Sequence, residues 1–202
     1  MAFLYFLSIV SPLFVILFGI RHRFTLLWLY AAAGLITEIL SFIVTEKHLL
    51  GNAFLLIEFL LISFYFRKQI FKNNSLFSII TVCVSLYFIL STLNKPIDHL
   101  NLEDASVFCL IYILYGLMFF YSFLKKDLSE NSQVLLAELG VNIALFVYAS
   151  GTLMIFLFSP VALKTENKLF IQIWYTVFLS LNIFRYTLIA FALYKKPKYI
   201  AE

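Results

Sequence analysis

Four charged side chains lie inside long apolar stretches of the chain, where charge is rare. They are Glu38, Glu58, Glu138 and Arg185. A charge at the centre of a membrane-spanning helix costs about 2.5–3.5 kcal/mol on insertion scales, so such a residue generally marks a functional site or pairs with another charge. Carboxylates can bind a cation or exchange a proton, and a guanidinium can neutralise a carboxylate through charge-assisted hydrogen bonds. The chemistry that these residue types indicate is cation or proton binding inside a membrane.

The polar residues recur at helical spacing. In the stretch 133–159, steps of three and four place them on one face of a helix; this face carries Glu138, Asn142, Ala149, Thr152 and Ser159. In the stretch 168–194, one stripe carries Gln172, Tyr175, Thr176, Asn182 and Tyr186, with Arg185 beside it. We expect both stripes to face protein or water and the remaining apolar faces to contact lipid.

Five residues are predicted to bind a ligand near the outer face. At 1.5 Å of rise per residue, four of them should lie about 10–12 Å below the outer ends of their helices, and the fifth is their neighbour; the five are Glu38, Glu58, Thr152, Tyr175 and Thr176. No basic residue is expected at the depth of Glu38 and Glu58, so these acids either lie in a wet cavity or carry protons. Both states suit a cation or proton site, and the alternative is structural hydrogen bonding to the neighbouring hydroxyls.

A second polar cluster is expected in the inner half of the membrane. Counted from the inner ends of their helices, Asn142 and Arg185 should lie about 14–15 Å deep. Glu138 is one helical turn closer to the inner face, so we predict an Arg185–Glu138 ion pair supported by Asn142 and Asn182. Such a pair could serve only to fix the register of the helices.

Composition sets the class of the protein. The 202 residues are 63% hydrophobic and only 13% charged, and the mean hydropathy is +0.97, whereas soluble domains have about 25% charged residues. This indicates an integral membrane protein whose first partner is the lipid bilayer. The first twenty residues lack the features of a cleaved signal peptide and are expected to remain as a helix. No basic and aromatic surface pattern indicates a nucleic-acid partner.

The predicted fold class is an all-α bundle of seven transmembrane helices that forms one domain over residues 1–202. The predicted helices are approximately 3–20, 24–44, 50–70, 75–93, 105–124, 134–159 and 168–194, each near the length that crosses a bilayer. Of the lysines and arginines in the loops and at the ends of these spans, ten fall on one side and four on the other. The N-terminus should therefore be outside and the C-terminus inside.

These observations predict transport or binding of a small solute or cation, with or without proton coupling, in a polar cavity open to the outside. The alternative is a non-catalytic sensor or subunit that signals to a membrane or cytoplasmic protein partner through basic loops at 67–72 and 125–126. No nucleophile motif, phosphate-binding loop or metal-ligand cluster is visible, so we expect neither an enzyme nor a cofactor nor a metal. The expected location is the inner (plasma) membrane of a bacterial cell.

Overall fold

The computed structural model describes residues 2–21, 25–45, 47–70, 75–96, 100–125, 132–164 and 168–195. All the regular structure in these residues is helical, which confirms the all-α prediction. The helices are α1 (Ala2–Arg21), α2 (Thr25–Leu40), α3 (Lys47–Ile70), α4 (Ser75–Leu93), α5 (Leu102–Leu124), α6 (Ser132–Lys164) and α7 (Lys168–Lys195).

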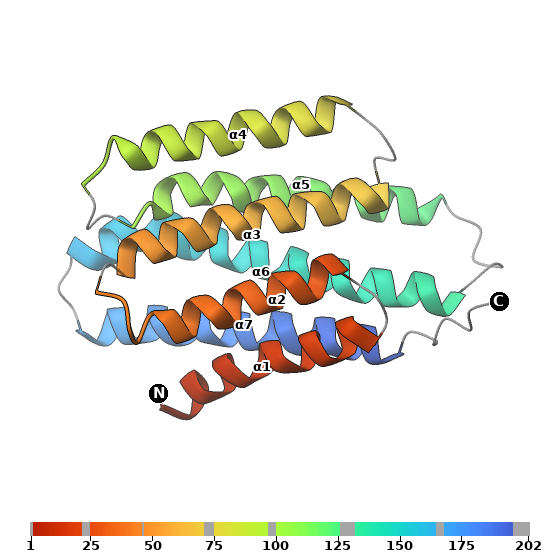
Figure 1. The fold of residues 1–202 in the computed structure, drawn as a ribbon, viewed down its shortest axis with the longest axis horizontal. Helices are drawn as coiled ribbons and strands as arrows, with labels where there is room; N and C mark the ends of the chain where they lie inside the picture. Colours follow the sequence, from red (N-terminus) through yellow and green to blue (C-terminus); the bar gives the residue numbers. More distant parts are fainter. Residues whose placement is uncertain are drawn as a thin grey trace.

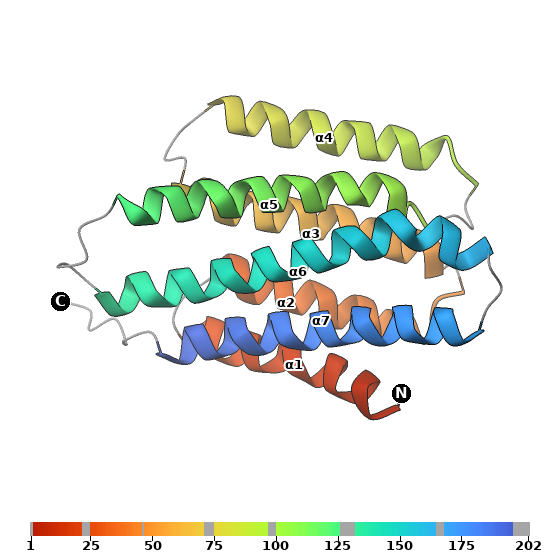
Figure 2. The ribbon, with the colours of Figure 1, turned by 180° about the vertical axis from the view of Figure 1, so that it is seen from behind.

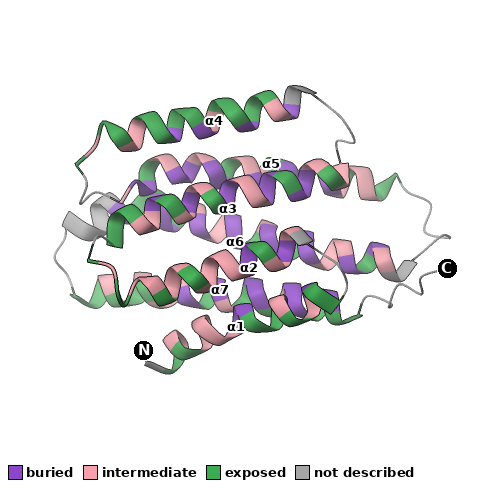
Figure 3. Cartoon of the chain, viewed as in Figure 1, coloured by how far each residue is buried: buried purple, intermediate pink, exposed green. Residues whose placement is uncertain are grey.

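Five of the helices in the described residues are long and apolar enough to cross a membrane: α1, α3, α5, α6 and α7. The apolar parts of α2 and α4 are shorter and cover Leu26–Leu40 and Phe77–Leu93. Exposed residues occur along the helices (Figure 3), and many of them are large and apolar. Soluble monomers avoid such a surface, whereas lipid contact requires it. The chain is therefore compatible with a polytopic membrane protein.

Six helices form a closed ring, in which each helix packs against the next. The order around the ring is α1, α2, α3, α5, α6 and α7, and α7 returns to α1. Helix α4 lies outside the ring and packs on α3 and α5 (Figures 1 and 2). Successive helices run in opposite directions. We call the end where α1 begins the N-terminal end of the bundle and the end where α7 stops the C-terminal end.

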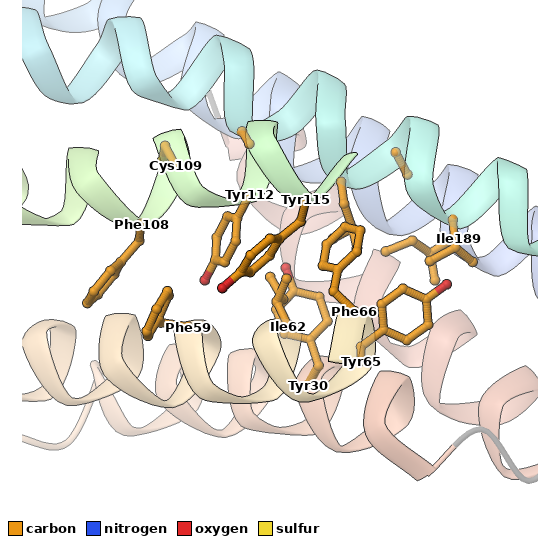
Figure 4. Close-up of a cluster of buried hydrophobic side chains, with 14 of the residues drawn as sticks. Tyr30, Phe59, Ile62, Tyr65, Phe66, Phe108, Cys109, Tyr112, Tyr115 and Ile189 are labelled. Carbon is orange, nitrogen blue, oxygen red and sulfur yellow. The ribbon is translucent and has the colours of Figure 1, made fainter. Parts of the chain in front are cut away.

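Aromatic packing joins α3 to α5 in the core (Figure 4). The ring of Phe59 stacks on that of Phe108, with centroids 4.2 Å apart, and Phe66 meets Tyr115 at 5.4 Å. Burying large aromatic side chains contributes much of the packing energy of a core. This packing fixes α3, which carries Glu58, against the rest of the ring.

A polar network holds α4 at the N-terminal end. Lys95, just after α4, forms an ion pair with Asp104 of α5 at 3.1 Å and donates to Asn101 Oδ1 at 2.6 Å. The Ser91 hydroxyl also donates to Asp104. In turn, the backbone amide of Asn101 donates to Asn52 Oδ1 of α3 at 2.9 Å. The outermost helix is thus tied to both helices on which it packs.

Several helix boundaries differ from the prediction. Helix α2 stops at Leu40 rather than 44, while α3 begins at Lys47 rather than 50, α5 begins at Leu102 and α6 runs on to Lys164. After Leu40 the backbone leaves the α-helical pattern and forms tighter turns, in which the amides of Phe42 and Ile43 donate to carbonyls three residues earlier. The Ser41 hydroxyl also donates to the carbonyl of Glu38 at 2.7 Å, which competes with regular helix bonding. Because depth is counted from the helix ends, these shifts change the depths assigned to Glu38 on α2 and Glu58 on α3.

Candidate functional site

A cavity of about 210 Å³ lies inside the ring, and all six ring helices contribute to its wall. Most of the wall is apolar. The polar and ionisable side chains in it include Glu38 from α2, Glu58 from α3, Tyr148 from α6, and Tyr175, Asn182, Arg185 and Tyr186 from α7. Of the five residues predicted to bind a ligand, the cavity brings together Glu38, Glu58 and Tyr175.

Arg185 and Glu58 form a buried ion pair across the ring. Arg185 Nη1 donates to Glu58 Oε1 at 2.5 Å, and the two residues are only 1% and 4% exposed. The Tyr30 hydroxyl of α2 donates to the same Oε1 at 3.0 Å. A buried charge is tolerated only when it is paired and hydrogen-bonded. Three helices, α2, α3 and α7, supply these partners.

The rest of the Arg185 guanidinium is enclosed by an amide and by aromatic rings. Nη2 donates to Asn182 Oδ1 at 2.6 Å. The guanidinium carbon lies over the rings of Tyr148, Tyr186 and Tyr30, at 3.6, 4.5 and 5.1 Å from their centroids. A cation over an aromatic face gains about 0.5–2 kcal/mol, and more where water is excluded. We call these residues, together with Glu58, the Arg185 site.

The predicted Arg185–Glu138 ion pair is wrong. The partner of Arg185 is Glu58, whose depth was misjudged because it was counted from Gly51 instead of from Lys47, where α3 begins. Counted from the C-terminal end, Arg185 lies ten residues before Lys195 and Glu58 twelve before Ile70, so both sit near mid-helix. Glu138 lies only six residues from the start of α6.

Glu38 and Glu58 share the cavity but not one layer, so this part of the prediction is also wrong. Tyr30, which contacts Glu58, lies eight residues before Glu38 on α2, a rise of about 12 Å. Glu38 is therefore about two helical turns nearer the N-terminal end. It is half-buried in the last turn of α2, and its carboxylate lies within electrostatic reach of the Tyr5 and Tyr175 phenols.

The charges of Glu38 and Glu58 are balanced differently. Glu58 has Arg185 as its counter-ion. Among the described residues, no basic group lies within ion-pair distance of the Glu38 carboxylate. The cavity thus combines a neutralised ion pair at mid-depth with an uncompensated carboxylate nearer one end.

The two predicted threonines do not line the cavity. Thr152 is fully buried in α6, and its hydroxyl has no hydrogen-bond partner among the described residues. Thr176 donates to the backbone carbonyl of Gln172 at 2.7 Å, as hydroxyls in membrane helices commonly do. Tyr175, by contrast, lines the cavity and is still 41% exposed.

The predicted inner cluster is divided. Asn182 and Arg185 belong to the Arg185 site, whereas Asn142 and Glu138 lie nearer the C-terminal end. There, Asn142 Nδ2 donates to the backbone carbonyl of Glu138 at 2.8 Å. Their neighbour is Tyr65 of α3, whose phenol is buried within electrostatic reach of both side chains.

Sequence reasoning missed the tyrosines of the Arg185 site. Tyr30 and Tyr148 were given no role, and Tyr186 was placed on a polar stripe without a function. A signal was available for Tyr148 and Tyr186, because they lie far from helix ends, where a membrane interface would place tyrosines. A guanidinium in the membrane interior needs aromatic faces as well as a counter-ion.

Comparison with protein-family models, curated proteins and solved structures finds no match to this chain.

Proposed function

We propose that the chain is a seven-span membrane protein that binds a small organic cation, such as a protonated amine, in the ring cavity as a step in its transport. The observation that carries the proposal is Glu38. It is an acidic side chain on the wall of a cavity whose other acid, Glu58, already has a counter-ion. The ionisable groups described in the wall therefore leave one negative charge to be balanced by the ligand.

The position of Glu38 strengthens the preference for a cation. It lies in the last turn of α2, where the aligned peptide dipoles of the helix give this end a partial negative charge. A carboxylate at this end is electrostatically unfavourable until a cation joins it. Tyr5 and Tyr175, beside Glu38, add aromatic faces that also attract cations.

The apolar part of the wall favours an organic cation over a bare metal ion. Phe54, Leu55, Phe156, Phe178 and Leu179 line the cavity. Ligand pockets with a mainly apolar wall and a few polar groups bind the apolar body of a ligand and orient its polar group. A small amine places its ammonium at Glu38 and its carbon chain against these side chains.

Equilibrium dialysis of the purified protein in detergent with radiolabelled ethylammonium tests this proposal. Changing Glu38→Gln keeps the shape of the side chain and removes its charge. We expect the affinity of the cavity site for ethylammonium to fall by roughly 10- to 100-fold, since a hydrogen bond to a charged group is worth about 1.5–3 kcal/mol. The control is Glu103→Gln, which changes an exposed acid of α5 and should leave affinity unchanged. If wild-type protein does not bind ethylammonium more tightly than ethanol, the partner-subunit alternative is preferred.

The connectivity supports seven spans. Helices α1, α3 and α5 run in the same direction (Figures 1 and 2), and each is long enough to cross a membrane. The chain must return between them, so α2 and α4 have to cross in the opposite direction despite their shorter apolar parts. We place the N-terminus outside the plasma membrane, because this puts the larger number of basic residues inside.

Cysteine labelling on intact cells tests this orientation with two positions on one helix. Glu103→Cys at the start of α5 should react with an impermeant thiol reagent. Lys125→Cys, directly after the same helix, should react only once the membrane is permeabilised. Cys83 is replaced by alanine in both variants, whereas Cys109 is buried and can stay. The reverse pattern of labelling would mean that the cavity opens to the inside.

A further inference from the structure

Three buried aliphatic side chains separate the cavity from the C-terminal half of the bundle. They are Ile62 of α3, Leu145 of α6 and Ile189 of α7. Each lies one helical turn closer to the C-terminal end than a residue of the Arg185 site, and none of them lines the cavity. In Figure 4, Ile62 lies beside Tyr30 and Ile189 lies near Tyr65. We call these three residues the apolar layer.

A second group of polar side chains lies beyond the apolar layer. This inner cluster consists of Tyr65 of α3 and of Glu138 and Asn142 of α6. Asn142 Nδ2 donates to the backbone carbonyl of Glu138 at 2.8 Å, which fixes the side-chain amide. This bond does not use the amide oxygen, Oδ1. The Tyr65 phenol is within electrostatic reach of the Glu138 carboxylate and the Asn142 amide. Tyr65 is 3% exposed and Asn142 is fully buried.

Two oxygens of the inner cluster lack partners. Neither the Tyr65 hydroxyl nor Asn142 Oδ1 makes a hydrogen bond of normal geometry to the described residues, although the Asn142 amide lies beside the Tyr65 phenol. No basic group in the described part of the chain lies within ion-pair distance of Glu138. Buried polar groups without partners are costly, and a hydrogen-bond donor or a cation would satisfy them.

We propose that the inner cluster is a second binding site for the same class of ligand, a small protonated amine. An ammonium group carries three donors and no acceptor, which matches a carboxylate, an amide oxygen and a phenol oxygen. The proposal rests on the function proposed for the cavity, and it extends the path of the cation past the apolar layer. A solute bound near Glu38 then reaches Glu138 only when Ile62, Leu145 and Ile189 move apart.

Binding stoichiometry tests the inner site separately from the outer one. In detergent both ends of the bundle are accessible, so equilibrium dialysis with radiolabelled ethylammonium counts both sites. We expect about two ethylammonium ions to bind per wild-type chain. The Glu38→Gln variant and the Glu138→Gln variant should each bind about one, because each change removes one uncompensated carboxylate. The double variant should bind none, and Glu103→Gln should match the wild type.

The two proposals fail in different ways. If wild-type protein binds one ethylammonium and Glu38→Gln none, the inner site is overturned while the outer one stands. If Glu38→Gln still binds as much as the wild type, the outer site is overturned.

A milder variant protects the test against misfolding. Tyr65→Phe keeps the packed ring and removes only a hydroxyl that lacks a partner among the described residues, so the fold should be retained. We expect this change to weaken one of the two binding steps by roughly tenfold and to leave the other unchanged. If both steps keep their affinities, the phenol does not contact the ligand and the inner site as defined here is wrong.

Discussion

Replacing Arg185 by alanine is expected to lower the free energy of unfolding by about 3–5 kcal/mol, the usual cost of removing one partner of a buried ion pair. The loss arises because Glu58 stays buried without its cation, and because three tyrosine rings lose the guanidinium they enclose. Glu58→Gln should also destabilise the protein, since it leaves the guanidinium without a carboxylate. Chemical unfolding in detergent, followed by circular dichroism, measures both.

A double-mutant comparison identifies the partner of Arg185. The double change Arg185→Leu with Glu58→Leu should recover much of the loss, because paired buried charges can be replaced by apolar residues at little cost. The matched control is Arg185→Leu with Glu138→Leu, which should show no recovery. Recovery with Glu138 and not with Glu58 would contradict the ion pair described above.

Tyr148→Leu is expected to destabilise the protein by about 2 kcal/mol or more, the value of a desolvated contact between a cation and an aromatic face. Tyr148 provides the closest of the three rings, at 3.6 Å from the guanidinium carbon. Leucine keeps an apolar side chain at this place but has no aromatic face. The same unfolding assay measures the change.

Tyr148→Phe is the control for this effect. Phenylalanine keeps the ring, so the free energy of unfolding of this variant should stay within about 1 kcal/mol of that of the wild type. Equal losses for leucine and phenylalanine would show that the hydroxyl, and not the ring, supports Arg185.

The sequence was sufficient to predict seven helical stretches and the presence of polar residues inside the bundle. Apolar length and helical periodicity depend on local sequence, so they can be read without a structure. The sequence also indicated that Arg185 needs an acidic partner. The choice between Glu58 and Glu138 depended on depth, and counting from Gly51 instead of Lys47, an error of four residues, moved Glu58 by about 6 Å. Pairing across a bundle is therefore more sensitive to helix ends than the fold is.

The directions in which side chains point were harder to predict. Thr152 and Thr176 lie on polar stripes, yet the first is buried in α6 and the second bonds to its own helix. A stripe spans a broad arc of the helix, and hydroxyls can satisfy themselves on the backbone without facing a cavity. Tyr175, with a long side chain and a polar tip, reaches the cavity from the same stripe.

The ion pair across the ring also affects how the chain is made. Glu58 and Arg185 are 127 residues apart in sequence. At a synthesis rate of about 5–20 residues per second, Glu58 is added on the order of 6–25 s before Arg185. Throughout that interval Glu58 has no access to its counter-ion, and the nascent bundle carries the full cost of an acid in its interior. Helix α7, which is synthesised after the other described helices, thus completes the electrostatic balance of α3, so a chain that stops before α7 lacks more than one span.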